Sequence, residues 1–206
     1  MENFLQVRLL PFDDDLNIAS VACAAKQSEI LSAKSEASAR EKYAAWKTLE
    51  NAASEIFSVS PEQISFSRTE YGKWCAEGFF FSLSHTSNFV AVALSNLPVG
   101  VDCESRCAFE KKASNGRLNA AKLLDRILTQ EEKKSGSFSP ERLLEVWTKK
   151  EAAFKYAGKG AYSPKELPIA SFADKTATFE CGDVVCAVCS DAVELLQVRL
   201  ATQKDL

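Results

Sequence analysis

Two short stretches of the sequence place carboxylates where they could bind a hard cation, and the first is VGVDCE at residues 99–104. Side chains alternate along an extended backbone, so Asp102 and Glu104 would project from one face, about 7 Å apart at the backbone. Their negative charges repel each other unless a cation or water lies between them. The pattern therefore fits either a solvated strand face or part of a magnesium site, because oxygen ligands suit that ion.

The second stretch, WTKKEAAFKYAGKG at residues 147–160, surrounds a single carboxylate with lysines. On a helix, Glu151 would lie on the flank of the apolar stripe that contains Trp147, with Lys155 one turn further along. An exposed Glu–Lys pair would contribute only about 0.3–0.5 kcal/mol. Alternatively, Glu151 reaches the strand at residues 99–104, three carboxylates converge on one cation, and the lysines hold phosphate groups.

His85 is the only histidine in the chain and follows FSLS at the end of an expected strand. Such a residue is often incidental, but near neutral pH it can donate a hydrogen bond to a phosphate or transfer a proton. Lys73 follows Gly72 in an expected turn and indicates little by itself. The chain has no Walker loop, no dinucleotide-binding glycine pattern and no nucleophile elbow.

The elements expected around these residues mix helices with antiparallel strands. Apolar residues recur at helical steps over residues 35–57, and a second helix is expected from residue 140 to 157, ending at Gly158. A shorter helix is expected at residues 120–128. Strands are expected at residues 64–68, in FFFSLS, NFVAVALS and VGVDCE as an antiparallel meander, and in ASFADKTATFE, DVVCAVCS and VELLQVRL. The predicted fold class is α+β.

Both halves of the chain have a similar inventory, a long helix and a few antiparallel strands, with a seam near residues 100–118. We therefore expect two similar-sized subdomains, residues 1–104 and 105–206, packed together. The pentapeptide LQVRL occurs at residues 5–9 and again at 196–200. Five residues are too few to establish a duplication, and coincidence is the favoured interpretation.

The composition limits the class of protein and its partners. With 206 residues, 46% hydrophobic and 26% charged, the chain resembles an ordinary soluble globular protein. A formal net charge of −3 argues against a nucleic-acid partner. No apolar run approaches the roughly 18 residues of a membrane span, and the N-terminus shows no secretory signal. We expect a cytoplasmic protein with no membrane partner.

Seven cysteines in a chain without a visible signal are expected to be reduced thiols. Cys181, Cys186 and Cys189 lie close together in the sequence, but they lack the paired spacing of zinc sites. They are expected to be core thiols.

Taken together, the order and spacing of these motifs resemble the 4′-phosphopantetheinyl transferases, in particular the larger, surfactin-synthetase type. That family's pattern reads approximately Gly-Lys-Pro, FNLSHS, GIDIE and WxxKEAxxKxxGxG. The counterparts here are Gly72-Lys73-Trp74, FSLSHT, GVDCE and WTKKEAAFKYAGKG, and ILTQEE at residues 127–132 looks like the family's acidic stretch. The resemblance spans about residues 40–160. Two departures are Trp74 in place of proline and Cys103 in place of an aliphatic residue.

The resemblance implies an enzyme that transfers the phosphopantetheine arm of coenzyme A to a serine of an apo carrier protein, with adenosine 3′,5′-bisphosphate as by-product. It implies two subdomains related by a pseudo-twofold axis, each a long helix packed on a small antiparallel sheet, with the active site in the cleft between them. We expect a monomer. Fatty-acid, polyketide and nonribosomal-peptide carriers all remain open as partners.

The resemblance also assigns roles to individual residues. Asp102, Glu104 and Glu151 would bind Mg²⁺, His85 and Lys155 would contact the phosphates, and Lys73 and Lys150 would hold the nucleotide end. Arg40 and Lys42 are the candidates for the 3′-phosphate, although the alignment slips by a residue there. The catalytic residues would be Glu151, Lys155 and His85, with Glu151 as the base that takes the serine proton and a water on the metal as the alternative.

Two other functions remain open. One is a catalytically silent relative that binds coenzyme A or a carrier protein. The other is an unrelated magnesium-dependent phosphoryl-transfer enzyme, which coenzyme A dependence would distinguish. The polar segment at residues 105–119 is a candidate contact with the carrier, because loops at a subdomain seam often bind partners.

Overall fold

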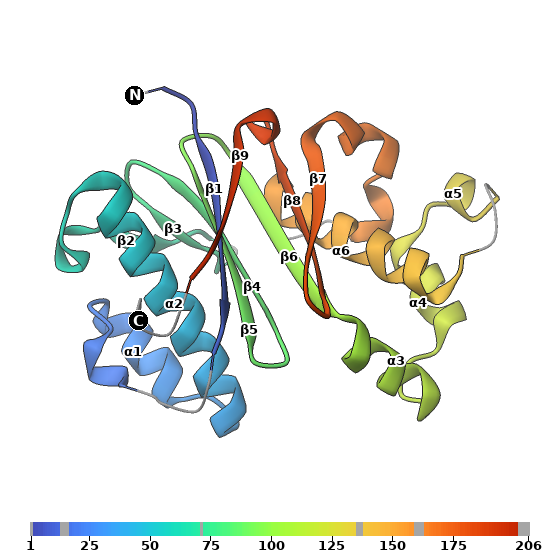
Figure 1. The fold of residues 1–206 in the computed structure, drawn as a ribbon, viewed down its shortest axis with the longest axis horizontal. Coiled ribbons are helices and arrows are strands. Elements are labelled where there is room, and N and C mark those ends of the chain that lie inside the picture. The colour runs from blue at the N-terminus through green and yellow to red at the C-terminus, as the bar shows by residue number, and fades with distance from the viewer. Residues whose placement is uncertain (1, 13–16, 71, 135–137, 159–162, 202–206) are drawn as a thin grey trace.

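The computed structural model describes residues 2–12, 17–70, 72–134, 138–158 and 163–201. Figure 1 shows two sheets side by side in the middle of the molecule, with α2 on one outer side and α6 on the other. The predicted α+β class is confirmed. None of the helices in the described part of the chain combines the length and apolar character that crossing a bilayer would require.

The helices and strands have the following bounds. The α-helices are α1 (Ala24–Leu31), α2 (Glu36–Phe57), α3 (Arg106–Ser114), α4 (Ala120–Ile127), α5 (Gln130–Lys134) and α6 (Pro140–Ala157). The strands are β1 (Leu5–Pro11), β2 (Phe66–Arg68), β3 (Trp74–Ala76), β4 (Phe80–Thr86), β5 (Phe89–Ser95), β6 (Val99–Ser105), β7 (Thr176–Cys181), β8 (Val184–Ser190) and β9 (Leu196–Leu200). Short 3₁₀ turns lie at Ile18–Ser20, Pro61–Gln63, Pro164–Glu166, Ile169–Lys175 and Val193–Leu195.

Both long helices were predicted from local signals, and their ends are where those signals placed them. The side chain of Ser35 accepts a hydrogen bond from the Ser38 backbone and caps the start of α2. Ser139 caps α6 in the same way, and Gly158 ends it in the left-handed conformation that favours glycine. The two longest helices therefore follow from the sequence alone.

The first sheet has the strand order β4–β5–β1–β9. Its first three strands are antiparallel, and β9 joins β1 in parallel. In that pairing the two LQVRL copies lie in register, with Val7 opposite Val198 and Arg8 opposite Arg199. The sheet is therefore mixed, whereas purely antiparallel sheets were expected.

The second sheet has the order β6–β8–β7, all antiparallel. The prediction that VGVDCE continues the meander of β4 and β5 is wrong, because β6 pairs with β8 from the far end of the chain. β4 nevertheless lies beside the other edge of β6, where backbone N–H groups of β6 donate to side chains of β4. Strand pairing thus crosses the expected boundary at residue 104 in both directions, with β6 in the second sheet and β9 in the first.

Apolar side chains pack in three layers. Between the sheets lies a core that includes Val7, Ala91, Val101 and Val188, all fully buried. Between α2 and the first sheet, the core includes Trp46 among its buried aromatic rings. The third layer lies under α6 and consists of two groups of apolar side chains, which include Leu143 and Leu144 in one and Ala152, Ala153 and Ala187 in the other.

Helices α1 and α3 were not predicted. In α3 the side chain of Ser105 accepts a hydrogen bond from the Ala108 backbone, and Phe109 is its one buried residue. In α1 the buried residues are Lys26 and Ile30. Because so few apolar side chains anchor these short helices, their sequences carry little helical periodicity.

All seven cysteines are free thiols. Cys103, Cys186 and Cys189 are fully buried, and Cys181 packs against the core between the sheets. The expectation of core thiols is confirmed.

Candidate active site

A close approach between α6 and β6 brings the two predicted motifs together. A Cβ atom at Gly100 would lie 2.0 Å from the carbonyl oxygen of Ala152 and 2.3 Å from the backbone nitrogen of Tyr156. Only glycine lets the helix backbone lie directly on the strand at this point. The same contact places Asp102 and Glu104 of β6 beneath Glu151 and Lys155 of α6.

Asp102 is buried, with 5% of its surface exposed. Its Oδ1 accepts hydrogen bonds from Ser84 Oγ at 2.7 Å and from Lys155 Nζ at 2.8 Å. Its Oδ2 is buried and has no hydrogen-bond partner among the described residues. One oxygen of this carboxylate is therefore held by two donors while the other has an open coordination position.

The other two carboxylates, Glu104 and Glu151, are half-buried, and the charge of Asp102 shifts the pKa of each. Burial, and then the charges of Asp102 and Glu151, raise the pKa of Glu104 to about 7. Burial, and then the charge of Asp102, also raise the pKa of Glu151. The charge of Asp102 thus acts on both Glu104 and Glu151 and disfavours the ionised form of each.

These carboxylates fit a magnesium ion by their chemistry. They supply oxygen ligands, which suit Mg²⁺, and the buried Oδ2 of Asp102 lacks a partner that a cation would provide. As the side chains are placed, no three His, Cys, Asp or Glu residues of the described ranges already enclose an ion position. A bound cation would therefore have to draw Glu104 and Glu151 toward Asp102, and relief of their repulsion favours that movement.

Two predicted coenzyme A ligands lie together at the junction of the sheets: Lys155, expected to contact the phosphates, and Lys73, expected to hold the nucleotide end. Besides Asp102, Lys155 Nζ donates to the carbonyl oxygens of Leu83 on β4, at 3.2 Å, and Val101 on β6, at 3.0 Å. Lys73 Nζ donates to the carbonyl oxygen of Lys155 at 2.8 Å. Burial, and then the charge of Lys155, lower the pKa of Lys73. The pair forms a cationic spot beside the carboxylates.

A row of hydroxyl groups on β4 joins the two sheets beside this site. The backbone nitrogens of Val101, Cys103 and Ser105 on β6 donate to the side-chain oxygens of Ser82, Ser84 and Thr86, respectively. The distances are 3.0, 3.4 and 3.3 Å. We call Ser82, Ser84 and Thr86 the hydroxyl row. Sequence reasoning missed it, although alternate hydroxyl residues in FSLSHT are its visible signal.

His85 lies at the end of β4, next to the hydroxyl row, with its side chain 46% exposed. Its Nδ1 lies 3.2 Å from Glu41 Oε2 on α2. A neutral imidazole that donates from Nδ1 leaves Nε2 as an acceptor, and a protonated one donates from both nitrogens. Glu41 therefore orients the only histidine and leaves Nε2 for a ligand.

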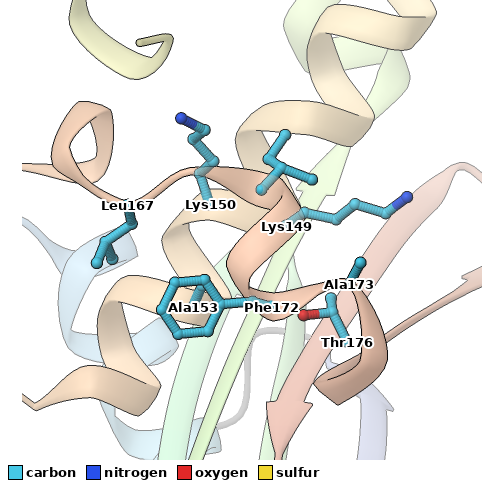
Figure 2. Close-up of a pocket in the computed structure, with 8 residues that line it drawn as sticks. Lys149, Lys150, Ala153, Leu167, Phe172, Ala173 and Thr176 are labelled. Carbon is cyan, nitrogen blue, oxygen red and sulfur yellow. The ribbon is translucent and has the colours of Figure 1, made fainter. Parts of the chain in front are cut away.

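Lys150 is placed differently from the other predicted ligands. It is 1% exposed, and its Nζ donates to Glu132 Oε2 at 2.5 Å. Its neighbour Lys149 pairs with Glu145 at 2.5 Å. Figure 2 shows that the two lysines extend away from each other at the edge of a pocket that Phe172 also lines. Each of the two lysines therefore has a carboxylate partner in the structure, Glu132 for Lys150 and Glu145 for Lys149.

Arg40 and Lys42 lie on α2, and both contact carboxylates. Arg40 pairs with Glu36 at 2.5 Å, and Lys42 Nζ lies 3.8 Å from Glu29 Oε1 on α1. The Glu29 carboxylate is also bound by Lys26 at 2.9 Å and by Arg68. A group of cations therefore surrounds Glu29, and its members Lys26 and Arg68 were not predicted. Lys159 lies outside the described residues.

Two further residues, Lys112 and Arg126, act on the site and had no motif to reveal them, and the two departures from the family pattern have defined places in the structure. The charges of Lys112 and Arg126 lower the pKa values of Glu104 and Glu151, respectively, against the larger effect of burial. Trp74, the departure from the family's proline, packs 5.1 Å from Trp46 and donates from Nε1 to Glu29 Oε2 at 2.9 Å. Cys103 packs in the core between the sheets, on the face away from the carboxylates, as expected.

Comparisons with known proteins find relatives of part of this chain. Residues 98–192 match the family model of the 4′-phosphopantetheinyl transferase superfamily. The 4′-phosphopantetheinyl transferase gsp of Aneurinibacillus migulanus is 31% identical over 119 residues, which cover 57% of this chain and 46% of that protein.

Two further relatives give a similar picture. A 4′-phosphopantetheinyl transferase of Bacillus subtilis is 28% identical over 132 residues, covering 60% of this chain and 53% of the relative. The 4′-phosphopantetheinyl transferase psf-1 of Bacillus pumilus is 28% identical over 109 residues, covering 52% and 45%. The chain thus spans about half the length of the curated relatives that it matches. The resemblance that the motifs predicted is confirmed by these matches, and Asp102, Glu104, Glu151 and Lys155 all lie within the segment that matches the 4′-phosphopantetheinyl transferase superfamily.

Proposed function

We propose that this protein is an enzyme that transfers the 4′-phosphopantetheine group of coenzyme A to a serine of an apo acyl or peptidyl carrier protein. The reaction depends on Mg²⁺ and releases adenosine 3′,5′-bisphosphate. The observation that carries the proposal is the contact of Lys155 with Asp102, whose charge also acts on Glu104 and Glu151, within the segment that matches the superfamily. The relatives bear the name of this activity.

In the reaction, the serine oxygen forms a bond to the β-phosphorus of the pyrophosphate, and the bond from that phosphorus to the bridging oxygen of the nucleotide breaks. Asp102, Glu104 and Glu151 would hold Mg²⁺, which would supply positive charge to neutralise the pyrophosphate. Lys155 and His85 bind phosphate oxygens and orient them, and Lys73 holds the nucleotide end. To reach a phosphate, Lys155 exchanges one of its backbone acceptors for it.

Glu151 takes the proton of the serine. Glu151 is half-buried and senses the charge of Asp102. A general base must lie within reach of the attacking hydroxyl, and this position next to the phosphate-binding residues satisfies that requirement. Glu151→Gln should lower kcat by about 100-fold or more, in the range of general base catalysis. Near-normal turnover by this variant, with Mg²⁺ dependence retained, would remove Glu151 as the base.

The function is tested by incubating the protein with coenzyme A, Mg²⁺ and a panel of apo carrier proteins, and weighing each carrier intact by mass spectrometry. A mass gain of one phosphopantetheine, absent with EDTA, is expected. Asp102→Asn keeps the shape of the side chain and should lower the rate at least about 100-fold. A folded protein that binds coenzyme A but modifies no carrier would instead be a silent binding module.

The remaining features are proposed on the same basis. The two helix-on-sheet units are related by a pseudo-twofold axis, with residues 1–104 and 105–206 as the subdomains and the site in the cleft between them; β6 and β9 each join the sheet of the other subdomain. The arrangement of α2 and α6 on the outer sides of two facing sheets supports this relation. The protein acts as a monomer in the cytoplasm, and its free thiols are typical of a reducing compartment. The polar segment at residues 105–119, which includes α3, is the proposed contact with the carrier.

A further inference from the structure

We propose that Ser84 is a positioning residue that fixes Asp102 so that only its Oδ2 is available to a divalent cation. This inference rests on the proposed function, because coenzyme A and the cation are its ligands. Ser84 acts through Asp102 and does not itself take part in the proposed reaction.

The first observation is the sharing of Asp102 Oδ1. Ser84 Oγ donates to it at 2.7 Å from β4, and Lys155 Nζ donates to it at 2.8 Å from α6. Two donors from different elements occupy the same oxygen, so the carboxylate cannot rotate freely about its Cβ–Cγ bond. The second oxygen, Oδ2, is buried without a partner among the described residues.

The second observation is that Ser84 is itself held in place. It is buried, and its oxygen accepts the backbone N–H of Cys103 at 3.4 Å. A hydroxyl that accepts from the backbone directs its single proton elsewhere, and here the proton goes to Asp102. The rotamer of Asp102 is therefore set by β4, a strand that supplies none of the three carboxylates.

This arrangement gives Ser84 the role of an outer-sphere partner to a metal ligand. Such partners orient the ligand, and their removal typically weakens metal binding about 10- to 100-fold. Without Ser84, Lys155 alone would hold Oδ1, and the carboxylate could turn either oxygen toward the ammonium. The open position at Oδ2 would then no longer be fixed.

The hydroxyl row provides a matched control. Ser82 Oγ accepts the backbone N–H of Val101 at 3.0 Å, as Ser84 does for Cys103, but no hydrogen bond joins it to Asp102. Both serines are buried. Ser82→Ala and Ser84→Ala thus remove the same kind of contact between the sheets, and only Ser84→Ala removes a donor from Asp102.

The experiment measures binding of Mn²⁺, a paramagnetic substitute for Mg²⁺, by the EPR signal of the free ion. The wild type, Ser82→Ala and Ser84→Ala are titrated with saturating coenzyme A, and coenzyme A without protein gives the background. We expect Ser84→Ala to bind Mn²⁺ at least about 10-fold more weakly than the wild type. Ser82→Ala should stay within about twofold of the wild type, and high Mg²⁺ should restore turnover of Ser84→Ala.

Each other result overturns the proposal. Equal Mn²⁺ affinity in Ser84→Ala and the wild type would show that Ser84 does not set the site. Equal weakening in both serine variants would show that the hydroxyl row acts only by joining the sheets. A wild type that binds Mn²⁺ no better than coenzyme A alone would remove the metal site itself, and this is seen before any substitution is compared.

Discussion

Lys150 shows how a residue inside a functional motif can be occupied by the fold. Its ammonium is buried against Glu132, whose carboxylate also accepts the backbone N–H groups of Ile169 and Thr129. Burial lowers the pKa of Lys150, and the charge of Glu132 opposes that effect. The resemblance assigns Lys150 to the nucleotide, whereas the structure uses it to connect α6 to the ILTQEE segment.

Removing the charge of Lys150 should therefore destabilise the protein. Lys150→Met leaves Glu132 without its buried cation, and we expect the free energy of unfolding to fall by about 3 kcal/mol. The neighbouring Lys149→Met removes a more exposed pair and should cost less than about 1 kcal/mol. Urea denaturation measures both. A stable Lys150→Met protein with a raised KM for coenzyme A would instead support the nucleotide role.

At the scale of elements, the contact between α6 and β6 depends on the absence of one side chain. Gly100→Ala would force a methyl group against the helix backbone at Ala152 and Tyr156. Because neither backbone can yield locally, we expect a loss of at least about 3 kcal/mol in the free energy of unfolding, and loss of activity.

Gly182→Ala is the matched control for this substitution. No atom lies within 4 Å of a Cβ at Gly182, but its φ of +57° is left-handed. Alanine there should cost about 1 kcal/mol from backbone strain alone, with activity retained. Similar losses for the two variants, measured by urea denaturation, would contradict the close approach of α6.

Helices α1 and α2 are joined through a buried carboxylate. Glu50 on α2 is fully buried, and its Oε1 accepts from the backbone N–H groups of Ala22 and Cys23 and from Trp46 Nε1. Burial raises the pKa of Glu50 above its ordinary value. Glu50 Oε1 thus accepts the backbone N–H groups just before α1, although burial disfavours the charged form of this side chain in the folded state.

This shift predicts a pH dependence of stability. The folded state binds the Glu50 proton more tightly than the unfolded state, so the contribution of this group is full below pH about 4.5 and is lost as the pH rises through its raised folded pKa. Glu50→Gln keeps the acceptor without the charge. Relative to the wild type, it should be more stable at pH 8 and unchanged at pH 4, as measured by thermal unfolding. The same difference at both pH values would contradict the prediction.

At the scale of the whole molecule, two strands from opposite ends of the sequence, β1 and β9, lie side by side. Strand β9 pairs with β1, and the arginines of the two LQVRL copies, Arg8 and Arg199, both bind Glu55 on α2, at 2.6 and 2.8 Å. The Arg8 side chain is 11% exposed and that of Arg199 is 52% exposed. The same carboxylate therefore has one buried and one solvated partner.

The two pairs should differ in strength. Arg199→Ala removes the solvated pair and should change the free energy of unfolding by less than about 1 kcal/mol. Glu55→Ala also leaves the buried Arg8 guanidinium without its carboxylate and should cost about 2 kcal/mol. Equal effects in urea denaturation would show that burial of Arg8 does not strengthen its pair.

The sequence by itself determined the features that depend on neighbouring residues. Serine caps, apolar spacing and Gly158 set the bounds of α2 and α6 within a few positions. Alternation along VGVDCE placed Asp102 and Glu104 on one face, and the motif order indicated the resemblance to the superfamily that residues 98–192 match. These signals act over a few residues, or as a linear pattern, so they can be read before the chain is folded.

Only the tertiary structure decided the pairings between distant segments. The partner of β6 is β8, about 85 positions along the chain, and the partner of β9 is β1, almost the full length away. The donors to Asp102, the carboxylate beside Lys150 and the alignment of the hydroxyl row with β6 all follow from such pairings. Many strands have compatible apolar patterns, so the choice among them is made by the packing of the whole core, which no local stretch of sequence contains.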